Sequence, residues 1–306
     1  MPERIAYDEF SYFHENASEF GLPYPGPPDV RRISIPVAPD RKLSALVWGP
    51  GEPELALLHG GAQNAHTWDT VALALNRPLI AIDLPGHGHS DSLAPGAGSV
   101  SPEFAAVDVA AAVRAHAPNA RGVVGMSLGG LTTIALAGHA PELVRSMVLV
   151  DVTPGVNAKK STFITNFVNG PATFPSFEEI LARTIEHNPG RTEASLRRGI
   201  LHNAVQAEDG SWVWRYRRFA NQPAIGNDKP TDLNRFGSLW DALGALTCPV
   251  LLARGMKVQS VVDDEDEAEL MRRVPTAKVE RFENAGHSIQ GDMPVELAAA
   301  IDRFIP

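Results

Sequence analysis

One serine in the sequence has neighbours typical of a nucleophile. Gly125-Met126-Ser127-Leu128-Gly129 places a glycine two positions before and two positions after it. An apolar run at 123–124 precedes this pattern and a helical run at 131–138 follows it. Strand, sharp turn and helix are the context in which G-x-S-x-G lifts a serine hydroxyl above a sheet. A serine held in this way can attack a carbonyl carbon when a nearby base takes its proton. The pattern therefore predicts Ser127 as the nucleophile of acyl transfer.

Short apolar runs alternate with helical stretches along most of the chain. Several of the runs, such as Leu55-Ala56-Leu57-Leu58, are apolar throughout, as expected for strands buried on both faces of a parallel sheet. The alternation predicts an α/β fold with a mainly parallel sheet. Strands are expected at 32–37, 43–48, 54–58, 79–83, 122–125, 146–150, 249–253 and 278–282. Helices are expected at 102–116, after Ser127, near Asp263 and at 294–304.

The alternation of strands and helices is interrupted twice. Residues 1–30 hold a helical stretch and a proline-rich run, which predict an N-terminal extension with a stiff spacer. The sequence of residues 155–246 predicts helices at 177–186 and 192–205 but shows no evident strand–helix unit. We expect this stretch to be an inserted helical cap, with an extended loop region as the alternative. The core of the fold is then formed by residues 31–154 and 247–306.

Three further motifs occur in a fixed order along the chain. His59-Gly60-Gly61-Ala62 follows the third strand, Asp83-Leu84-Pro85-Gly86-His87-Gly88-His89-Ser90 follows the fourth, and Asn284-Ala285-Gly286-His287 follows the last. With the serine motif, they make the chain from about residue 30 onward resemble the α/β-hydrolase superfamily, in particular its capped serine esterases and lactone hydrolases. The resemblance implies an eight-stranded, mainly parallel sheet that is flanked by helices and carries an inserted helical cap.

The resemblance also implies the roles of the site residues. His287 should act as the general base that takes the proton of Ser127. An oxyanion formed by this attack needs two preorganised N–H donors. The backbone N–H of Leu128 should be one donor, and that of Gly61 should be the other, with Ala62 as the alternative.

The acid of the triad is less evident from the sequence. Most α/β-hydrolases place it just after the seventh strand, but here 254–260 contains no carboxylate. Asp151, directly after the sixth strand, is the preferred candidate, because a minority of the superfamily keeps its acid there. Asp263 or Asp264 is the alternative, although both belong to an acidic run typical of the first turn of a helix.

The nucleophile type restricts the reaction. A serine excludes the branches that use a carboxylate nucleophile and leaves acyl transfer to water through an acyl-enzyme. The main hypothesis is hydrolysis of a carboxylic ester or lactone of a hydrophobic small molecule. Carbon–carbon bond hydrolysis, cofactor-free perhydrolysis and a hydrolase-like small-molecule receptor are the alternatives. Aromatic residues of the expected cap could line the substrate pocket or pack the cap: Phe163, Phe167, Trp212 and Trp214.

Composition and charge narrow the set of partners. The formal charge of −9 argues against nucleic acid. A single cysteine, Cys248, excludes an internal disulfide framework and a multi-cysteine metal site, and we expect neither a metal nor a cofactor. The charged N-terminus and the lack of a run of roughly 18–20 apolar residues predict a cytoplasmic protein without a membrane span. A homo-oligomer remains open, since the extension could pack on its own core or on a neighbour.

Overall fold

The eight predicted strands are all present, with ends within two residues of the expected ones. They are β1 (Val30–Ala38), β2 (Arg41–Trp48), β3 (Leu55–Leu58), β4 (Leu79–Asp83), β5 (Gly122–Met126), β6 (Met147–Val150), β10 (Val250–Gly255) and β11 (Lys278–Phe282). The structure is a computed structural model that describes residues 4–92, 100–156, 159–217 and 236–306. The strands form one sheet in the order β1-β2-β4-β3-β5-β6-β10-β11.

Most of this sheet is parallel. Only the pairs β1–β2 and β2–β4 are antiparallel, while the five other pairs run in the same direction. Because parallel strands end at one edge, the residues that follow β3, β5, β6 and β10 meet there. The register agrees with this, since Leu58 pairs with Gly125, Met126 with Val150, and Val150 with Ala253. The prediction of an α/β fold with an eight-stranded, mainly parallel sheet is confirmed.

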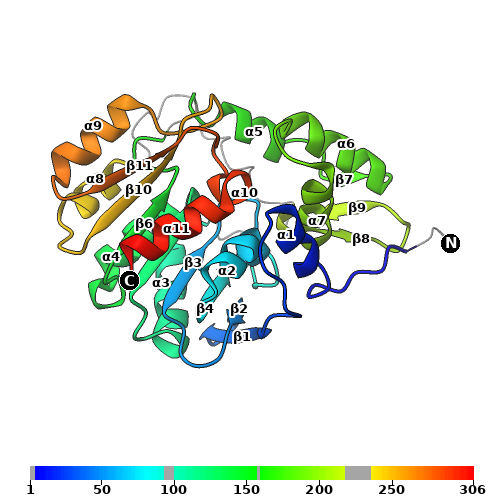
Figure 1. The fold of residues 1–306 in the computed structure, drawn as a ribbon, viewed down its shortest axis with the longest axis horizontal. Helices are drawn as coiled ribbons and strands as arrows, with labels where there is room; N and C mark the ends of the chain where they lie inside the picture. Colours follow the sequence, from blue (N-terminus) through cyan, green and yellow to red (C-terminus); the bar gives the residue numbers. More distant parts are fainter. Residues whose placement is uncertain (1–3, 93–99, 157–158, 218–235) are drawn as a thin grey trace.

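Helices cover both faces of the sheet (Figure 1). Apolar side chains of one set of helices pack on one face: α1 (Phe13–Glu19), α2 (Asp69–Leu75), α10 (Ile289–Asp292) and α11 (Pro294–Phe304). Those of a second set pack on the other: α3 (Pro102–His116), α4 (Leu128–His139), α8 (Gly237–Gly244) and α9 (Asp264–Arg273). The strands between them are buried over their whole length at β3, β4, β5 and β6, which explains their continuous apolar sequences. Among the described residues, no helix is long and apolar enough to span a bilayer.

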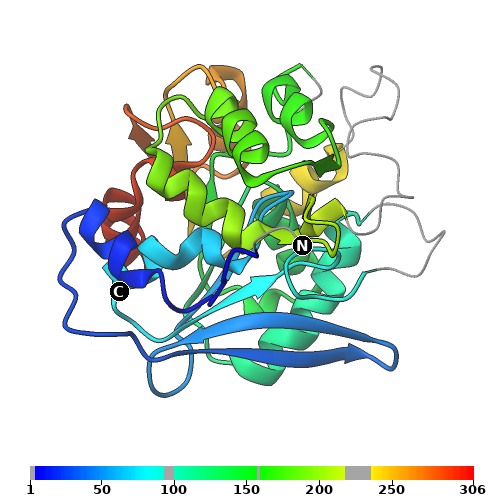
Figure 2. The ribbon, with the colours of Figure 1, turned by 90° about the vertical axis from the view of Figure 1, so that its right-hand side faces the viewer.

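The segment between β6 and α8, which we call the insertion, lies beyond the carboxyl edge of the sheet (Figures 1 and 2). Its described part contains α5 (Thr162–Val168), α6 (Phe177–His187) and α7 (Glu193–Asn203). It also holds a small antiparallel sheet that the sequence did not predict, formed by β7 (Thr173–Phe174), β8 (Ala204–Gln206) and β9 (Trp212–Trp214). The β1–β2 hairpin lies at the opposite end of the molecule from α5 and α6 (Figure 2).

The N-terminal extension packs on its own chain. Phe13 of α1 is buried against Trp48, with ring centroids 4.9 Å apart. Glu15 and Glu19 pair with Arg198, so α1 is also tied to helix α7 of the insertion. The extension therefore connects the core with the insertion.

Candidate active site

Ser127 occupies a strained turn between β5 and α4. Its φ of 52° and ψ of −117° are unusual for a residue with a side chain. The flanking glycines are required by close packing, because a Cβ on Gly125 would lie 2.4 Å from the Gly129 carbonyl oxygen. A Cβ on Gly129 would lie 2.2 Å from the carbonyl oxygen of Leu58 at the end of β3. The glycines thus let the turn close and place Ser127 at the carboxyl edge of the sheet.

Asp151 and His287 form a hydrogen-bonded pair at the same edge. The Nδ1 atom of His287 lies 2.9 Å from Oδ2 of Asp151. Asp151 is fully buried, directly after β6, and also accepts hydrogen bonds from Gly255 N, Ser260 Oγ and Val261 N at 2.9, 2.6 and 3.0 Å. A buried carboxylate is stable only when it is satisfied in this way. Its position is therefore fixed from the β10 side, and it holds the imidazole of His287.

The two alternative acids lie elsewhere. Asp263 is the N-cap of α9, where its side chain forms a capping box with Asp266 and an ion pair with Lys160. The exposed Asp264 pairs with Arg254. Neither residue has a hydrogen bond with His287, whose imidazole is bonded to Asp151 instead.

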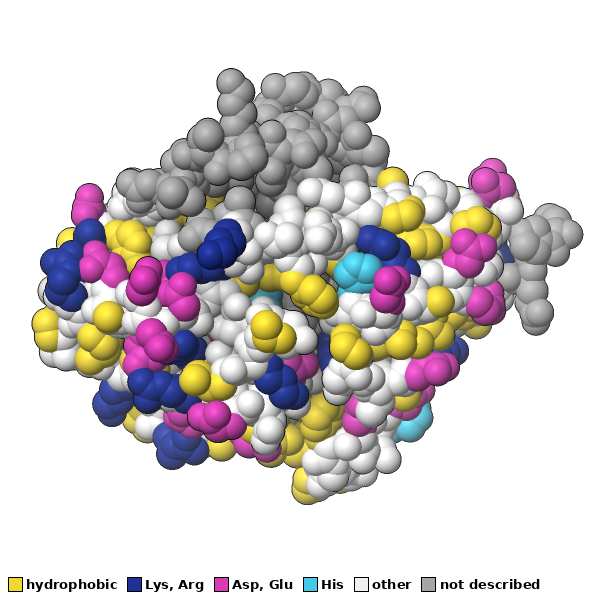
Figure 3. Space-filling view, turned by 90° about the horizontal axis from the view of Figure 1, so that it is seen from above, with side chains coloured by type: hydrophobic (Ala, Val, Ile, Leu, Met, Phe, Trp, Pro, Cys, Tyr) yellow, Lys and Arg dark blue, Asp and Glu magenta, His cyan; other side chains and the backbone are white. Residues whose placement is uncertain are grey.

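A cavity of about 560 Å³ connects the site residues. Both Ser127 and His287 line it, together with Gly61, Ala62 and Leu128. The volume lies within the usual range for small-molecule sites. The view onto the carboxyl edge shows hydrophobic side chains at the rim of a hollow on this face (Figure 3). The cavity can hold a small molecule against the serine hydroxyl.

The loop after β3 lies close to the serine. A Cβ on Gly60 would lie 2.4 Å from Sδ of Met126 and 3.3 Å from Cβ of Ser127. Ala62 in this loop has a left-handed φ of 62°, which is uncommon for a residue other than glycine. Its carbonyl oxygen accepts a hydrogen bond of 2.6 Å from Nδ2 of Asn203, the last residue of α7. Sequence reasoning missed Asn203, because nothing in its local sequence distinguishes it from other helix-terminal polar residues.

The aromatic residues expected in the pocket divide into two groups. Phe163 and Phe167, on α5, line the cavity. Trp212 and Trp214 do not, which corrects the sequence-based placement. Both are buried in the apolar core of the insertion, where Trp212 packs on Phe177 at 5.1 Å between ring centroids. Their large apolar surfaces stabilise the insertion itself.

The histidines of the neighbouring loops form hydrogen bonds with backbone atoms. His59 is fully buried, its Nδ1 hydrogen-bonds the Gly60 carbonyl oxygen and its Nε2 accepts from Leu84 N. Burial, and then the nearby charge of His87, lower the pKa of His59 to about 3. Burial also lowers the pKa of His87. Both rings therefore stay neutral near pH 7 and hold turns in place.

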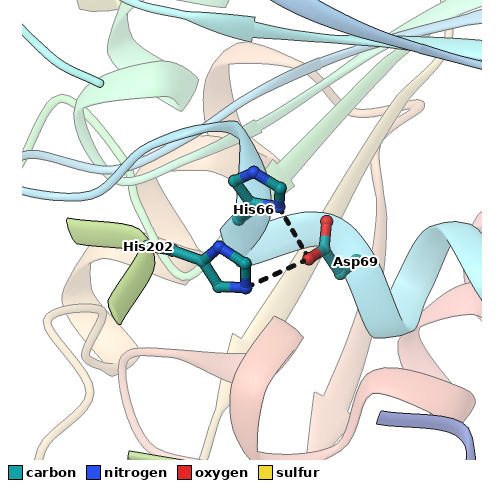
Figure 4. Close-up of side chains that lie close together, drawn as sticks. All are labelled: His66, Asp69 and His202. Carbon is teal, nitrogen blue, oxygen red and sulfur yellow. Dashed lines mark hydrogen bonds and ion pairs between the residues drawn. The ribbon is translucent and has the colours of Figure 1, made fainter. Parts of the chain in front are cut away.

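A second cluster of titratable groups lies between the core and α7 (Figure 4). His66 Nδ1 is 2.8 Å from Oδ2 of Asp69, and His202 Nε2 is 3.9 Å from the same oxygen. Both imidazole rings are buried and stack with centroids 3.9 Å apart and planes 14° from parallel. On its other side, His66 Nε2 is 3.1 Å from Oε2 of Glu9, which also pairs with Arg32. The cluster joins the extension, the core and the insertion.

These three side chains are the types that bind transition metals, and their ligand atoms lie within 4.8 Å of one another. Their geometry fits a proton better than an ion, because nearly parallel stacked rings do not direct two nitrogen lone pairs at one point. Burial opposes a charge on His66, but Asp69 and Glu9 outweigh it and raise the pKa of His66 to about 9. Burial, and then the charge of His66, lower the pKa of His202 well below its usual range. Near pH 7, His66 is therefore the protonated, positively charged imidazole of this cluster.

The comparisons with known proteins agree with this architecture. The sequence profile described as "Alpha/beta hydrolase family" matches residues 55–300. The chain belongs to the alpha/beta hydrolase family, and the prediction of a hydrolase enzyme is confirmed.

Among proteins of known name, the chain is similar to Esterase Rv0045c of Mycobacterium tuberculosis, with 42% identity over 299 residues that cover 95% of this chain and 94% of the relative. A solved structure of that esterase matches with a TM-score of 0.82 and 40% identity, covering 98% of this chain and 99% of the other. The 3-hydroxybutyrate-oligomer hydrolase of Cupriavidus necator is 28% identical over 84% of this chain and 90% of the relative.

The charge on His66 makes a pH-dependent contribution to stability. Because its folded-state pKa of about 9 lies above the ordinary value of 6.5, the contribution is complete below pH 6.5 and is lost as pH rises towards 9. We expect His66→Gln to lower the free energy of unfolding, and the difference from wild type to shrink by about 3 kcal/mol between pH 6 and pH 9.5. Urea unfolding at both pH values measures this.

The exposed His139 on α4 offers a matched control. His139→Gln should change the free energy of unfolding much less than His66→Gln does at pH 6. A deficit of His66→Gln that is equal at pH 6 and pH 9.5 would show that the imidazole contributes only packing.

Proposed function

We propose that this chain hydrolyses a carboxylic ester or lactone of a hydrophobic small molecule through an acyl-enzyme on Ser127. The observation that carries the proposal is the buried Asp151–His287 hydrogen bond beside a strained serine turn, with Ser127 and His287 lining one cavity. The name of the 42% identical relative, Esterase Rv0045c, supports the ester as the bond that is cleaved. The apolar side chains of Phe163 and Phe167 on the cavity wall support a hydrophobic substrate.

In this proposal Asp151 orients His287. With Nδ1 bound to Asp151, the Nε2 atom of His287 is the nitrogen that takes the proton from Ser127. The serine oxygen then attacks the ester carbonyl carbon and forms a tetrahedral oxyanion. His287 returns the proton to the leaving alcohol, which leaves the acyl-enzyme, and a water activated by the same histidine releases the acid.

The developing oxyanion requires two N–H donors. Leu128 begins helix α4 directly after Ser127, so its N–H is among those that have no partner within the helix. We assign it as one donor, and the N–H of Gly61 as the other, with Ala62 as the alternative. All three residues line the cavity, and Gly60 packs against Cβ of Ser127, which supports this assignment.

We assign the insertion, the part of the predicted cap (residues 155–246) that precedes α8, as the cap that shapes the substrate pocket, since α8 itself packs on the core sheet. Support comes from Phe163 and Phe167 on α5, which line the cavity above the carboxyl edge of the sheet. Further support comes from Asn203 at the end of α7, which contacts the loop after β3.

Removal of the nucleophile or the base should abolish turnover of a nitrophenyl ester. We expect Ser127→Ala and His287→Ala each to lower kcat by at least about 10⁴-fold while thermal unfolding stays close to wild type. Ser127→Ala should also lose labelling by a fluorophosphonate. Wild-type rates in either variant would contradict the proposal. A stoichiometric burst of acylation without turnover in wild type would favour the receptor hypothesis.

The acid can be identified by two matched substitutions. Asp151→Asn should lower kcat by about 10⁴-fold, because the amide no longer stabilises the imidazolium in its working orientation. Asp263→Asn keeps a good helix cap and should leave kcat within about twofold, since Asn and Asp are similar N-caps. Steady-state kinetics on one ester distinguish them. A larger loss of kcat in Asp263→Asn than in Asp151→Asn would identify Asp263, the N-cap of α9, as the acid.

Asn203 should act as a positioning residue for the loop after β3. Because its amide nitrogen holds the carbonyl of the strained Ala62, Asn203→Ala and the isosteric Asn203→Asp both remove the donor. We expect kcat to fall by about tenfold with little change in KM, since preorganisation of an oxyanion donor is lost while ground-state binding is kept. Kinetics on a nitrophenyl ester and the rate of phosphonate labelling should fall together.

The exposed Asn169, at the end of α5, provides the control. Asn169→Ala should leave both rates unchanged. An increase in KM alone for the Asn203 variants would show that Asn203 only shapes the pocket.

A further inference from the structure

Arg191, in the connection between α6 and α7, is a cation on the wall of the catalytic cavity. It lines the same cavity as Ser127 and His287. Its side chain is half-buried, and its Nε atom is buried without a hydrogen-bond partner among the residues that the structure describes. The Nη2 atom donates to Ser195 Oγ at 2.5 Å. A neutral hydroxyl leaves the positive charge uncompensated, so most of the donors of this guanidinium remain available.

The acidic residues near Arg191 are engaged with other groups. Glu19 accepts from Arg198 and from the hydroxyl of Thr192. Asp292 accepts from the backbone N–H of Gly286 at 2.9 Å. Within the described part of the chain, Arg191 forms no ion pair with a carboxylate, and its hydrogen-bond partner is the Ser195 hydroxyl. Arg198, in the following helix α7, is by contrast a buried arginine that pairs with two carboxylates.

The surroundings of Arg191 are arranged around its guanidinium. Its Nη1 atom lies over Gly291 of α10, where a Cβ would come within 2.8 Å of it. Burial lowers the pKa of Arg191, whereas the more distant Asp292 and Glu19 act to raise it. Burying an arginine without an ion pair is unfavourable, so such a group in a cavity indicates a ligand that completes it. Lys257 also lines the cavity, but its side chain is exposed to solvent.

We propose that Arg191 binds a carboxylate carried by the substrate, at a distance from the ester that Ser127 attacks. The preferred substrates are then monoesters with a free acid group, and this inference rests on the proposed function. A planar guanidinium matches a carboxylate with two parallel hydrogen bonds, which a lysine cannot reproduce. The apolar walls at Phe163 and Phe167 accommodate the carbon chain between the two groups.

The test compares two nitrophenyl esters that differ in one charge, the valerate and the glutarate hemiester. For wild type, kcat/KM should favour the hemiester. In Arg191→Gln the ratio of kcat/KM, hemiester over valerate, should fall about tenfold or more, as expected for the loss of a charged hydrogen bond. Arg191→Lys should give an intermediate ratio. Butyryl esters of glycolate and of ethanol repeat the comparison with the charge on the alcohol side, and so identify the side of the ester that Arg191 contacts.

Arg197 on α7 lies outside the cavity lining and supplies the charge control. Arg197→Gln removes the same net charge and should leave the ratio at its wild-type value. An unchanged ratio in Arg191→Gln for both ester pairs, or an equal fall in Arg197→Gln, would overturn the proposal.

A binding measurement separates this inference from the proposed function. Calorimetry of monomethyl glutarate on Ser127→Ala requires no turnover. We expect binding that weakens about tenfold or more when Arg191→Gln is added. Equal affinity in the two variants would overturn the role of Arg191 even if esters are hydrolysed. If Arg191→Gln weakens binding but wild type hydrolyses no ester, the carboxylate-binding role of Arg191 is supported and the proposed esterase function is contradicted.

Discussion

The backbone at Ser127 is the constraint on which the rest of the site depends. A positive φ at a residue with a side chain is unfavourable by roughly 1–3 kcal/mol and persists only where the surroundings enforce it. Here β5 at the centre of the sheet and helix α4 behind it enforce it together. Their approach is possible because Gly125 and Gly129 lack side chains, since a Cβ on either residue would come within 2.4 and 2.2 Å, respectively, of a backbone oxygen. The packing of the buried strand β5 against α4 thus holds Ser127 in its strained conformation.

The position of Asp151 depends on the same sheet. Asp151 also has a positive φ, 47°, and lies at the end of β6, directly beside β5 in the sheet. The stretch after β10, which lacks a carboxylate of its own, supplies instead the hydrogen bonds of Gly255, Ser260 and Val261. These donors satisfy the buried charge of Asp151. The geometry at His287 Nδ1 remains a single hydrogen bond of 2.9 Å.

Much of this could be predicted from the sequence, for identifiable reasons. Buried parallel strands have continuous apolar sequences, and Ser127 and Asp151 follow such strands directly. His287 lies five residues after the partly exposed β11, where the motif Asn284-Ala285-Gly286-His287 identifies it. Contacts between distant segments have no such local signal. From the sequence alone, Trp212 and Trp214 could line the pocket or pack in a core. The pairing of β7, β8 and β9 places both in the apolar core of the insertion. The predicted helix over 192–205 ends instead at Asn203, because Ala204–Gln206 pair with β9.

Helix α7 connects several of these non-local features. Its last residues, His202 and Asn203, contact the core at Asp69 and at the loop after β3. Arg191 and Ser195 at its other end face the cavity. At 1.5 Å per residue, the ten steps from Glu193 to Asn203 span about 15 Å along the helix axis. A helix anchored at one end to the loop beside Ser127 holds the cation at its other end at a fixed distance. Helix α7 therefore couples the position of Arg191 on the cavity wall to that of the loop beside Ser127.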